Sequence, residues 1–281
     1  MRKISMTTSQ FMRYGDEADG FAKMRALGFD ACDYSPLTQP GRGLLGLTED
    51  ERLRVLTKAR ENAEAAGVEI YQAHGPWVGA VTPFNSTPEG RREWADAMRT
   101  DLDCCALLGC PHLVVHPVMP FGGASTADEE GYLRINREFW SDVLEHAEKT
   151  GVKLLLENMP FLQQSLSTCK AMIEFVRSFQ TDAFAMCYDT GHALVFGENI
   201  ADNIALIGDK LLAFHIHDND GRRDLHMCPY FGVADWNAFR EAVKSVPESV
   251  PLSLEAGAGK VPAHLQEDFL RAFAKVAREL A

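Results

Sequence analysis

Imidazole and carboxylate side chains recur where short apolar segments of this chain end. The densest group lies in the stretch AFHIHDNDGRRDLH, where His215, Asp224 and His226 follow an apolar run. Histidine nitrogens and carboxylate oxygens together bind divalent ions such as Zn²⁺, Mn²⁺, Co²⁺ or Mg²⁺, whereas thiolates select softer metals. These residue types predict a divalent-metal centre if the fold brings the side chains together.

Five other apolar segments end in a residue that can bind a metal. The full set of candidate ligands is His74, His116, Glu157, Asp189, His192, His215, Asp224, His226 and Glu255. A single histidine in such a position is more often an ordinary polar residue near a core. Glu157 (KLLLENM) and Glu255 (LSLEAG) follow leucines that are expected to be buried, where an unpaired carboxylate is costly. As a set, these residues favour a functional site over separate structural ion pairs.

Apolar segments alternate with amphipathic segments along the whole chain. We expect strands at 3–9, 29–35, 69–75, 112–118, 153–159, 183–192, 211–218 and 251–257, and helices at 16–27, 48–67, 88–108, 127–150, 168–179, 200–207, 235–246 and 262–280. Thr48 begins a capping-box spacing, and glycine follows most of the helices. Eight strand–helix pairs without a linker predict an α/β fold, a (β/α)8 TIM barrel, in which residues 1–281 form a single domain.

A barrel of this kind places the carboxyl ends of all its strands on one face, where active sites are built. Long connections follow the third, fourth and seventh strands, and they lie on this same face. Trp77, Phe121 and Phe231 on these connections can wall a pocket, and Arg222 can reach a hydroxyl or phosphate oxygen. Together with Asn158, which follows Glu157, these residues are the expected substrate-binding set. Ordinary loop packing is the alternative for each of them.

Composition excludes several classes of protein. The formal net charge of −12 over 281 residues argues against nucleic acid as a partner, because nucleic-acid-binding surfaces neutralise phosphates with Lys and Arg. No apolar run is long enough to span a membrane, and the first residues lack the apolar core of a secretory signal. Seven cysteines without CxxC spacing favour reduced thiols and a cytoplasmic location. Association into a homo-oligomer is left open.

Six motifs carry a resemblance to a known family. YQAHG, VVHP, LLLEN, YDTGHA, HIHDNDGRRDLH and SLEAG occur in the order found in the xylose-isomerase-like barrel superfamily. This superfamily groups sugar and sugar-phosphate isomerases and epimerases with zinc-dependent apurinic-site endonucleases. The resemblance covers the chain from the third strand onward and implies the same barrel.

The resemblance also implies a ligand set. Glu157, Asp189, His215 and Glu255 match the residues that hold the metal in the ketose epimerase branch. The additional candidates His74, His116, His192, Asp224 and His226 match ligands with which the nucleases bind several zinc ions, so between one and three ions are expected.

His215 and His217 are both candidates for the metal ligand at the end of the seventh strand. His215 stands three residues before Asp218, as the family histidine does in its H-x-x-D motif. His217 alternates with His215 along the strand and should therefore point to the opposite side. We expect His217 to pack outside the metal site or to support one of its ligands.

These observations predict a divalent-metal-dependent isomerase or epimerase of a small sugar or sugar phosphate. Glu157 and Glu255 would move a proton next to a carbonyl as base and acid, and the metal would stabilise the enediolate oxygens. One alternative is a zinc-dependent apurinic-site endonuclease, although SMTTSQ, HPVMPFGG and LLENMP depart from the nuclease motifs. The others are a metal-dependent lyase on a sugar derivative and a non-catalytic metal-binding barrel.

Overall fold

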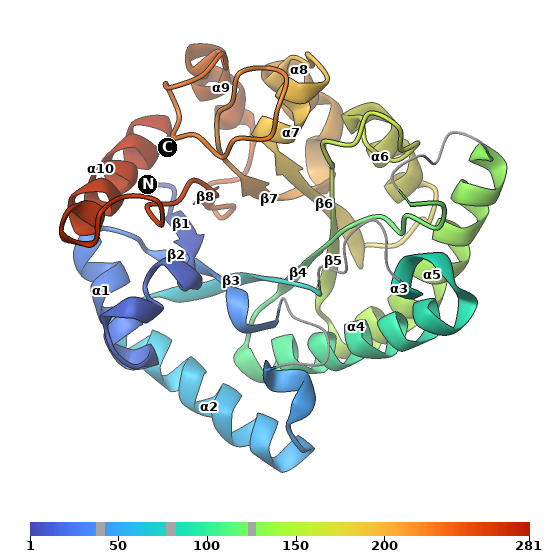
Figure 1. Cartoon of the computed structure of the whole chain (residues 1–281), viewed down its shortest axis with the longest axis horizontal. Helices are drawn as coiled ribbons and strands as arrows, with labels where there is room; N and C mark the ends of the chain where they lie inside the picture. Colours follow the sequence, from blue (N-terminus) through green and yellow to red (C-terminus); the bar gives the residue numbers. More distant parts are fainter. Residues whose placement is uncertain (38–42, 77–82, 123–127) are drawn as a thin grey trace.

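A computed structural model describes residues 1–37, 43–76, 83–122 and 128–281. Within these ranges eight parallel strands pair in the order β7-β6-β5-β4-β3-β2-β1-β8. The strands are β1 (Ile4–Thr7), β2 (Ala31–Tyr34), β3 (Glu69–His74), β4 (His112–Val115), β5 (Lys153–Glu157), β6 (Phe184–Asp189), β7 (Leu211–His215) and β8 (Leu252–Leu254). They form an inner ring that the helices surround (Figure 1), so the expected TIM barrel is confirmed.

The barrel closes where β7 meets β8. Ile216, one residue beyond β7, forms a parallel bridge with Leu254. Its N–H donates to the Ser253 carbonyl over 2.8 Å, and its carbonyl accepts from the Glu255 N–H over 3.0 Å. These bonds hold the ends of β7 and β8 together, so that the residues following both strands lie at the same place on the rim.

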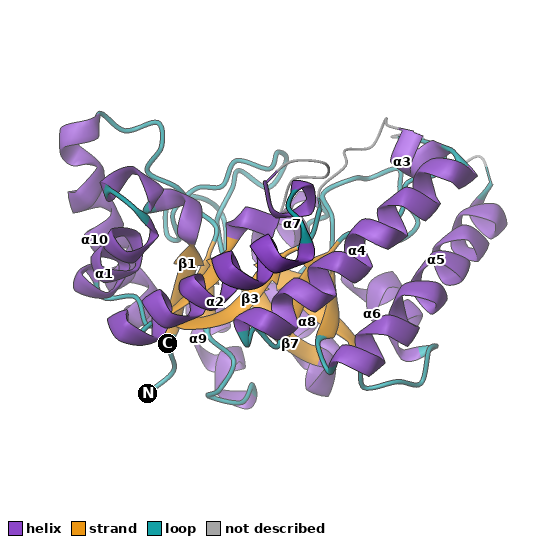
Figure 2. Cartoon of the chain, turned by 90° about the horizontal axis from the view of Figure 1, so that it is seen from below, coloured by secondary structure: helices purple, strands orange, loops and turns teal. Residues whose placement is uncertain are grey.

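Helices cover the outside of the strands, as Figure 2 shows from the side. They are α1 (Glu17–Leu27), α2 (Glu49–Ala66), α3 (Pro83–Ser86), α4 (Pro88–Leu108), α5 (Glu129–Thr150), α6 (Cys169–Arg177), α7 (Thr190–Val195), α8 (Ile200–Ile207), α9 (Trp236–Ala242) and α10 (Gln266–Leu280). All eight expected helices are present. The expected capping box forms at α2, where the Thr48 and Glu51 side chains each bond the other's backbone N–H, an arrangement that stabilises a helix by about 1 kcal/mol.

Several strands end earlier than their apolar patterns predict. The sixth was expected to reach His192, but β6 ends at Asp189, whose carboxylate accepts a hydrogen bond from the His192 N–H over 2.6 Å. This bond caps α7, because the first N–H groups of a helix have no partner within the helix. The chain therefore turns from strand to helix between two candidate ligands, and both side chains stay at the rim of the barrel.

A buried arginine precedes β1 at the amino-terminal end of the strands. The Arg2 guanidinium donates hydrogen bonds of 2.7–2.9 Å to the carbonyls of Val243, Val246, Pro247 and Val250. This contact ties the amino terminus to the segment before β8, at the end of the barrel opposite the candidate ligands. All seven cysteines lie in the described ranges and are free thiols, as expected. No helix in the described part of the chain is long and apolar enough to cross a membrane.

Candidate metal centre

The carboxyl ends of the strands surround a cavity of about 790 Å³. Every candidate ligand except Asp189 lines it. Thr7, Ser35 and Ser253 add hydroxyl groups to the lining, and Met159 and Phe161 add apolar groups. The volume falls within the range of small-molecule sites, and the lining mixes polar and apolar groups as such sites do.

Four candidate ligands converge at the centre of this face. One ligand atom each from Glu157, Asp189, His215 and Glu255 lies within 4.8 Å of all the others. The first three residues end β5, β6 and β7, and Glu255 follows β8. The Glu255 Oε2 atom is buried and has no hydrogen-bond partner among the residues that the structure describes. A mixed carboxylate and imidazole set with an unsatisfied buried oxygen fits a divalent metal. We call these four residues the central group.

Glu157 is shared between the central group and a second group, which comprises His74, His116 and Glu157. Its Oε1 atom lies 2.7 Å from His215 Nδ1, and its Oε2 atom lies 2.9 Å from His116 Nε2 and 3.7 Å from His74 Nε2. Each carboxylate oxygen therefore faces a different set of imidazoles. This arrangement suits a carboxylate that contributes to two neighbouring metal sites.

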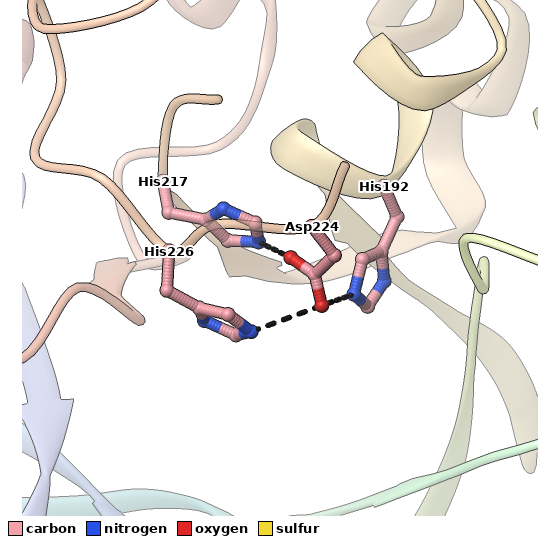
Figure 3. A group of neighbouring side chains, drawn as sticks. All are labelled: His192, His217, Asp224 and His226. Carbon is pink, nitrogen blue, oxygen red and sulfur yellow. Dashed lines mark hydrogen bonds and ion pairs between the residues drawn. The ribbon is translucent and has the colours of Figure 1, made fainter. Parts of the chain in front are cut away.

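A third group consists of His192, His217, Asp224 and His226 (Figure 3). Asp224 lies between the three rings. Its Oδ2 atom is 3.1 Å from His226 Nε2 and 3.4 Å from His192 Nε2, and its Oδ1 atom is 3.7 Å from His217 Nε2. The structure thus brings all nine predicted ligands together at one end of the barrel, in three adjoining groups.

The expectation that His217 points away from the site is wrong, whereas the expectation that it supports a ligand agrees with its contact with Asp189. Side chains alternate only while a strand continues, and β7 ends at His215. The His217 N–H then donates to Thr190 Oγ1 over 3.1 Å, and its Nε2 atom lies 3.1 Å from the Asp189 carboxylate. His215 and His217 therefore both face the rim, one in the central group and the other in the third group.

Asp33 and Gln72, which were not predicted from the sequence as site residues, contact the His215 side chain. Its Nε2 atom lies 3.3 Å from Asp33 Oδ2 and 2.9 Å from Gln72 Nε2, and the Gln72 amide donates to Asp33 over 3.0 Å. All three side chains are buried. A carboxylate on the second ring nitrogen orients a ligand histidine and makes it a better donor. The available signal was a polar residue within each of two strands that were expected to be buried.

We expect Asp33→Asn to lower metal affinity by about 10- to 100-fold, because the substituted amide no longer holds the His215 ring as a carboxylate does. Competition between the protein and a coloured chelator measures this affinity. Asp182→Asn is the matched control, since the Asp182 side chain is fully exposed and far from the site. Equal affinity in wild type and Asp33→Asn would contradict the role assigned to Asp33.

Asp218, the acid of the H-x-x-D motif, anchors the long loop after β7. Its buried carboxylate accepts hydrogen bonds from the Gly232 N–H (3.0 Å), the Ala234 N–H (3.1 Å) and the Trp236 indole N–H (2.8 Å). The loop carries Asp224 and His226 to the rim. Asp218 therefore positions ligands of the third group without belonging to it.

The five expected substrate-binding residues fall in different places. Arg222 lines the cavity. Asn158 is buried and exchanges two hydrogen bonds of 2.8 and 2.9 Å with the Asp189 backbone, so it positions that ligand. Phe121 and Phe231 are 41% and 73% exposed, and neither is among the described residues that line the cavity. Trp77 lies outside the described residues. Contact of these side chains with substrate stays a prediction.

The pKa values of the two glutamates in the central group are shifted in opposite directions. Burial raises the pKa of both, but the charge of His215 and hydrogen bonds from His116, His215 and His74 outweigh it at Glu157, whose pKa lies well below its usual value. At Glu255 burial and the nearby charges of Glu157 and Asp189 keep the pKa raised. Carboxyl groups with separated pKa values are typical of acid and base pairs in active sites.

Two histidines of the third group, His192 and His226, predict how stability depends on pH in the metal-free protein. Burial lowers the pKa of these two histidines, but Asp189 and Asp224 raise the pKa of His192 to about 10, and Asp224 raises that of His226 to about 9. Each proton stabilises the folded state below the ordinary histidine pKa of about 6.5, and this contribution is lost as pH rises through 9 and 10. Chelator-treated protein should therefore lose thermal stability between pH 7 and 10, and His192→Gln should lose less. Equal slopes in the two proteins would contradict this.

Comparisons with known proteins agree with the barrel fold. Residues 21–274 match the model of the xylose isomerase-like TIM barrel family. An uncharacterized protein of Sinorhizobium fredii is 27% identical over 59% of this chain and 53% of its own length. Probable endonuclease 4 of Citrifermentans bemidjiense is 35% identical over 44% of this chain and 47% of its own. Inosose isomerase of Bacillus licheniformis is 22% identical over 63% and 66%. The matches with the first two relatives thus span about half of their length.

Solved structures share the fold over the whole chain. The 3-keto-D-glucoside 4-epimerase of E. coli superposes with a TM-score of 0.77 at 16% identity, covering 99% of both chains. D-psicose 3-epimerase of Clostridium cellulolyticum H10 gives 0.79 at 16% identity and 99% of both chains. The IolI protein, solved with a zinc atom, gives 0.74 at 17% identity, 99% of this chain and 96% of its own. With the family model covering all but the ends of the sequence, this chain belongs to the xylose isomerase-like TIM barrel family.

Proposed function

We propose that this protein is a divalent-metal-dependent isomerase or epimerase of a small sugar or sugar phosphate. The observation that carries the proposal is the convergence of Glu157 and Glu255 with Asp189 and His215 in one group, beside a cavity of sugar-accommodating size. Two carboxylates beside a bound carbonyl compound can remove a proton and return it. The central group thereby combines metal ligands with an acid and base pair.

Each part of the site has its own role in the proposed reaction. Glu157, whose pKa is lowered, takes the proton from the carbon next to the carbonyl, and Glu255, whose pKa is raised, supplies one. Glu157, Asp189, His215 and Glu255 would hold a divalent metal, which would supply positive charge for the substrate oxygens. Arg222 and the hydroxyls of Thr7 and Ser35 bind sugar oxygens. The neighbouring apolar side chains exclude water from the exchanging proton.

The comparisons support this choice of reaction class. Two structures that share the fold are named as sugar epimerases, and one relative is named inosose isomerase. The zinc atom in the IolI structure supports a divalent metal. Zinc, manganese, cobalt and magnesium all remain candidates for the ion, with between one and three ions per chain.

Exchange of carbon-bound hydrogen tests the proposal. Purified protein is incubated in deuterated water with a panel of ketoses, ketose phosphates and inososes, with added metal or with chelator. We expect at least one compound to gain deuterium next to its carbonyl, and only with metal. Product analysis separates isomerisation from bond cleavage by a lyase. No metal-dependent exchange in the whole panel would reject the proposal and favour a non-catalytic metal-binding barrel.

A second candidate is a zinc-dependent apurinic-site endonuclease. It is favoured by the second and third ligand groups, which a one-metal epimerase does not need, and by the relative named probable endonuclease 4. The net charge of −12 weighs against it, because the DNA backbone is itself anionic. Cleavage of an abasic duplex by the zinc-loaded protein, with an intact duplex as control, would decide for this candidate.

A further inference from the structure

We propose that the substrate is a cyclic polyhydroxy ketone, a ring that carries the reacting carbonyl on one of its own carbons, and that it binds with a C–H face against an apolar wall of the cavity. This inference rests on the proposed function, because it names the class of ketone on which the central group would act. It depends on the walls of the cavity rather than on the metal ligands, so ligand binding alone can test it.

One side of the cavity is apolar. It is lined by Met159, Pro160 and Phe161, which follow β5, and by Val195, which ends α7 after β6. Met159 is buried, whereas the other three side chains are partly exposed. Apolar surface that stays in contact with water is available to a ligand, because covering it is favourable. We call these four residues the apolar wall.

The other side of the cavity carries hydroxyl groups. They belong to Thr7 at the end of β1, Ser9 just after it, Ser35 after β2 and Ser253 in β8. Among the described lining residues Leu254 is the apolar one on this side, and it is only 1% exposed. Thr7, Ser9 and Ser35 are at least partly exposed, and a hydroxyl can both donate and accept hydrogen bonds. We call the four hydroxyl residues the hydroxyl wall.

The order of the strands places the two walls across the cavity from each other. In the closed ring β1 lies four strands from β5, and β2 lies four strands from β6. Figure 1 shows β1 and β2 on one side of the ring and β5 and β6 on the other. A ligand in the cavity can therefore contact apolar groups on one side and hydroxyls on the other.

A ring matches two unlike walls better than an open chain does. In a polyhydroxylated cyclohexane ring most hydroxyls point outward from the edge, so that a face of the ring exposes C–H groups. An open-chain polyol carries hydroxyls along its whole length and has no continuous C–H face. The aromatic ring of Phe161 offers a flat surface with a partial negative charge, which attracts C–H hydrogens. Hydroxyls on the edge of the bound ring, or standing axially on its other face, can then reach the hydroxyl wall.

The two walls also continue from the two proposed catalytic carboxylates. Glu157 precedes Pro160 by three residues, and Glu255 follows Ser253 by two residues. A ring between the walls can point its edge toward both carboxylates. In a ketose the carbonyl is free only in the open chain, whereas in an inosose it stands on the ring itself. A ring that keeps its carbonyl therefore satisfies the walls and the carboxylates at the same time.

Two polyols without a carbonyl test the preference for a ring in the absence of turnover. The cyclic polyol myo-inositol and the open-chain polyol D-glucitol have equal numbers of carbons and hydroxyls. Isothermal titration calorimetry of the zinc-loaded protein measures the affinity for each. We expect myo-inositol to bind at least about 10-fold more tightly, because it covers the apolar wall and loses less conformational freedom on binding.

Variants of the apolar wall separate its contribution from the rigidity of the ring. Val195→Thr keeps the shape of the side chain but places a hydroxyl in the wall, and Phe161→Leu removes the aromatic face. We expect each to lower the ratio of the two affinities by about 2- to 10-fold, the range of one aromatic contact. Leu162→Ala is the matched control and should keep the ratio, since Leu162 is 60% exposed and is not among the described residues that line the cavity. Far-ultraviolet circular dichroism checks the fold of every variant.

Hydrogen exchange in deuterated water scores the proposed function separately. Exchange into open-chain ketoses, together with equal affinities for the two polyols, would overturn the cyclic substrate and leave the reaction class intact. Wall-dependent binding of myo-inositol without exchange into any inosose would reject the reaction and retain the cyclic ligand. The inference is also overturned if neither polyol binds, or if both wall variants keep the ratio of wild type.

Discussion

Glu157→Gln is expected to lower the rate of metal-dependent hydrogen exchange by about 10²- to 10⁴-fold, the usual contribution of a general base. The reason is visible in its contacts. One carboxylate oxygen accepts from His215 Nδ1 and the other from His116 Nε2. Glutamine has the same shape but only one acceptor oxygen, so one of these two imidazoles would face an N–H group. The rate of deuterium incorporation at saturating metal measures the effect.

Measuring zinc content alongside the exchange rate separates the loss of a base from the loss of a metal ligand. Zinc content should also fall in Glu157→Gln, because Glu157 belongs to two ligand groups. If excess metal restores the exchange rate to that of wild type, Glu157 is only a ligand, and its role as base is rejected. Glu248→Gln is the control, since this glutamate is exposed and its only described contact is the amino terminus.

The fold could be predicted from the sequence because each level of the pattern agrees with the others. Apolar strands and amphipathic helices repeat eight times, glycine follows most of the helices, and a closed parallel barrel buries all the strands. Most of the candidate ligands could be predicted because they follow an apolar run, and Asp224 and His226 could be predicted from the motif on the loop after the seventh strand. In a barrel this position determines the face on which a side chain lies, even when the exact end of the strand is uncertain.

Contacts between segments could not be predicted in the same way. His217 was misplaced because strand alternation was extended past His215, where the chain has already left β7 to bridge Leu254. Asp33 and Gln72 were missed because their partner, His215, lies on a strand distant in sequence. Asn158 bonds the backbone of the neighbouring strand, so its role depends on register. Such contacts depend on distances of a few ångströms between strands, and they cannot be predicted from the periodicity within one strand.

Glu255→Gln is expected to lower turnover by a similar factor of about 10²- to 10⁴-fold, yet to stabilise the metal-free protein. Burial and the charges of Glu157 and Asp189 raise the pKa of this carboxyl, which means that the folded state disfavours its ionised form. The folded state therefore loses stability as pH rises from the usual glutamate pKa through the raised one, because ionisation of Glu255 costs it free energy. An uncharged amide of the same shape removes this cost.

Glu157→Gln should have the opposite effect on the metal-free protein. Its carboxylate has a lowered pKa and is paired with the buried His215, whose pKa is raised, so its removal leaves the charge of His215 uncompensated, a loss of about 3–5 kcal/mol for a buried pair. Urea denaturation of the chelator-treated variants at pH 7.5 compares the two. A Glu255→Gln variant that is less stable than wild type, or that turns over normally, would contradict its assignment as the acid. Opposite shifts in stability with a shared loss of activity would show that Glu255 is kept for its chemistry at the expense of stability.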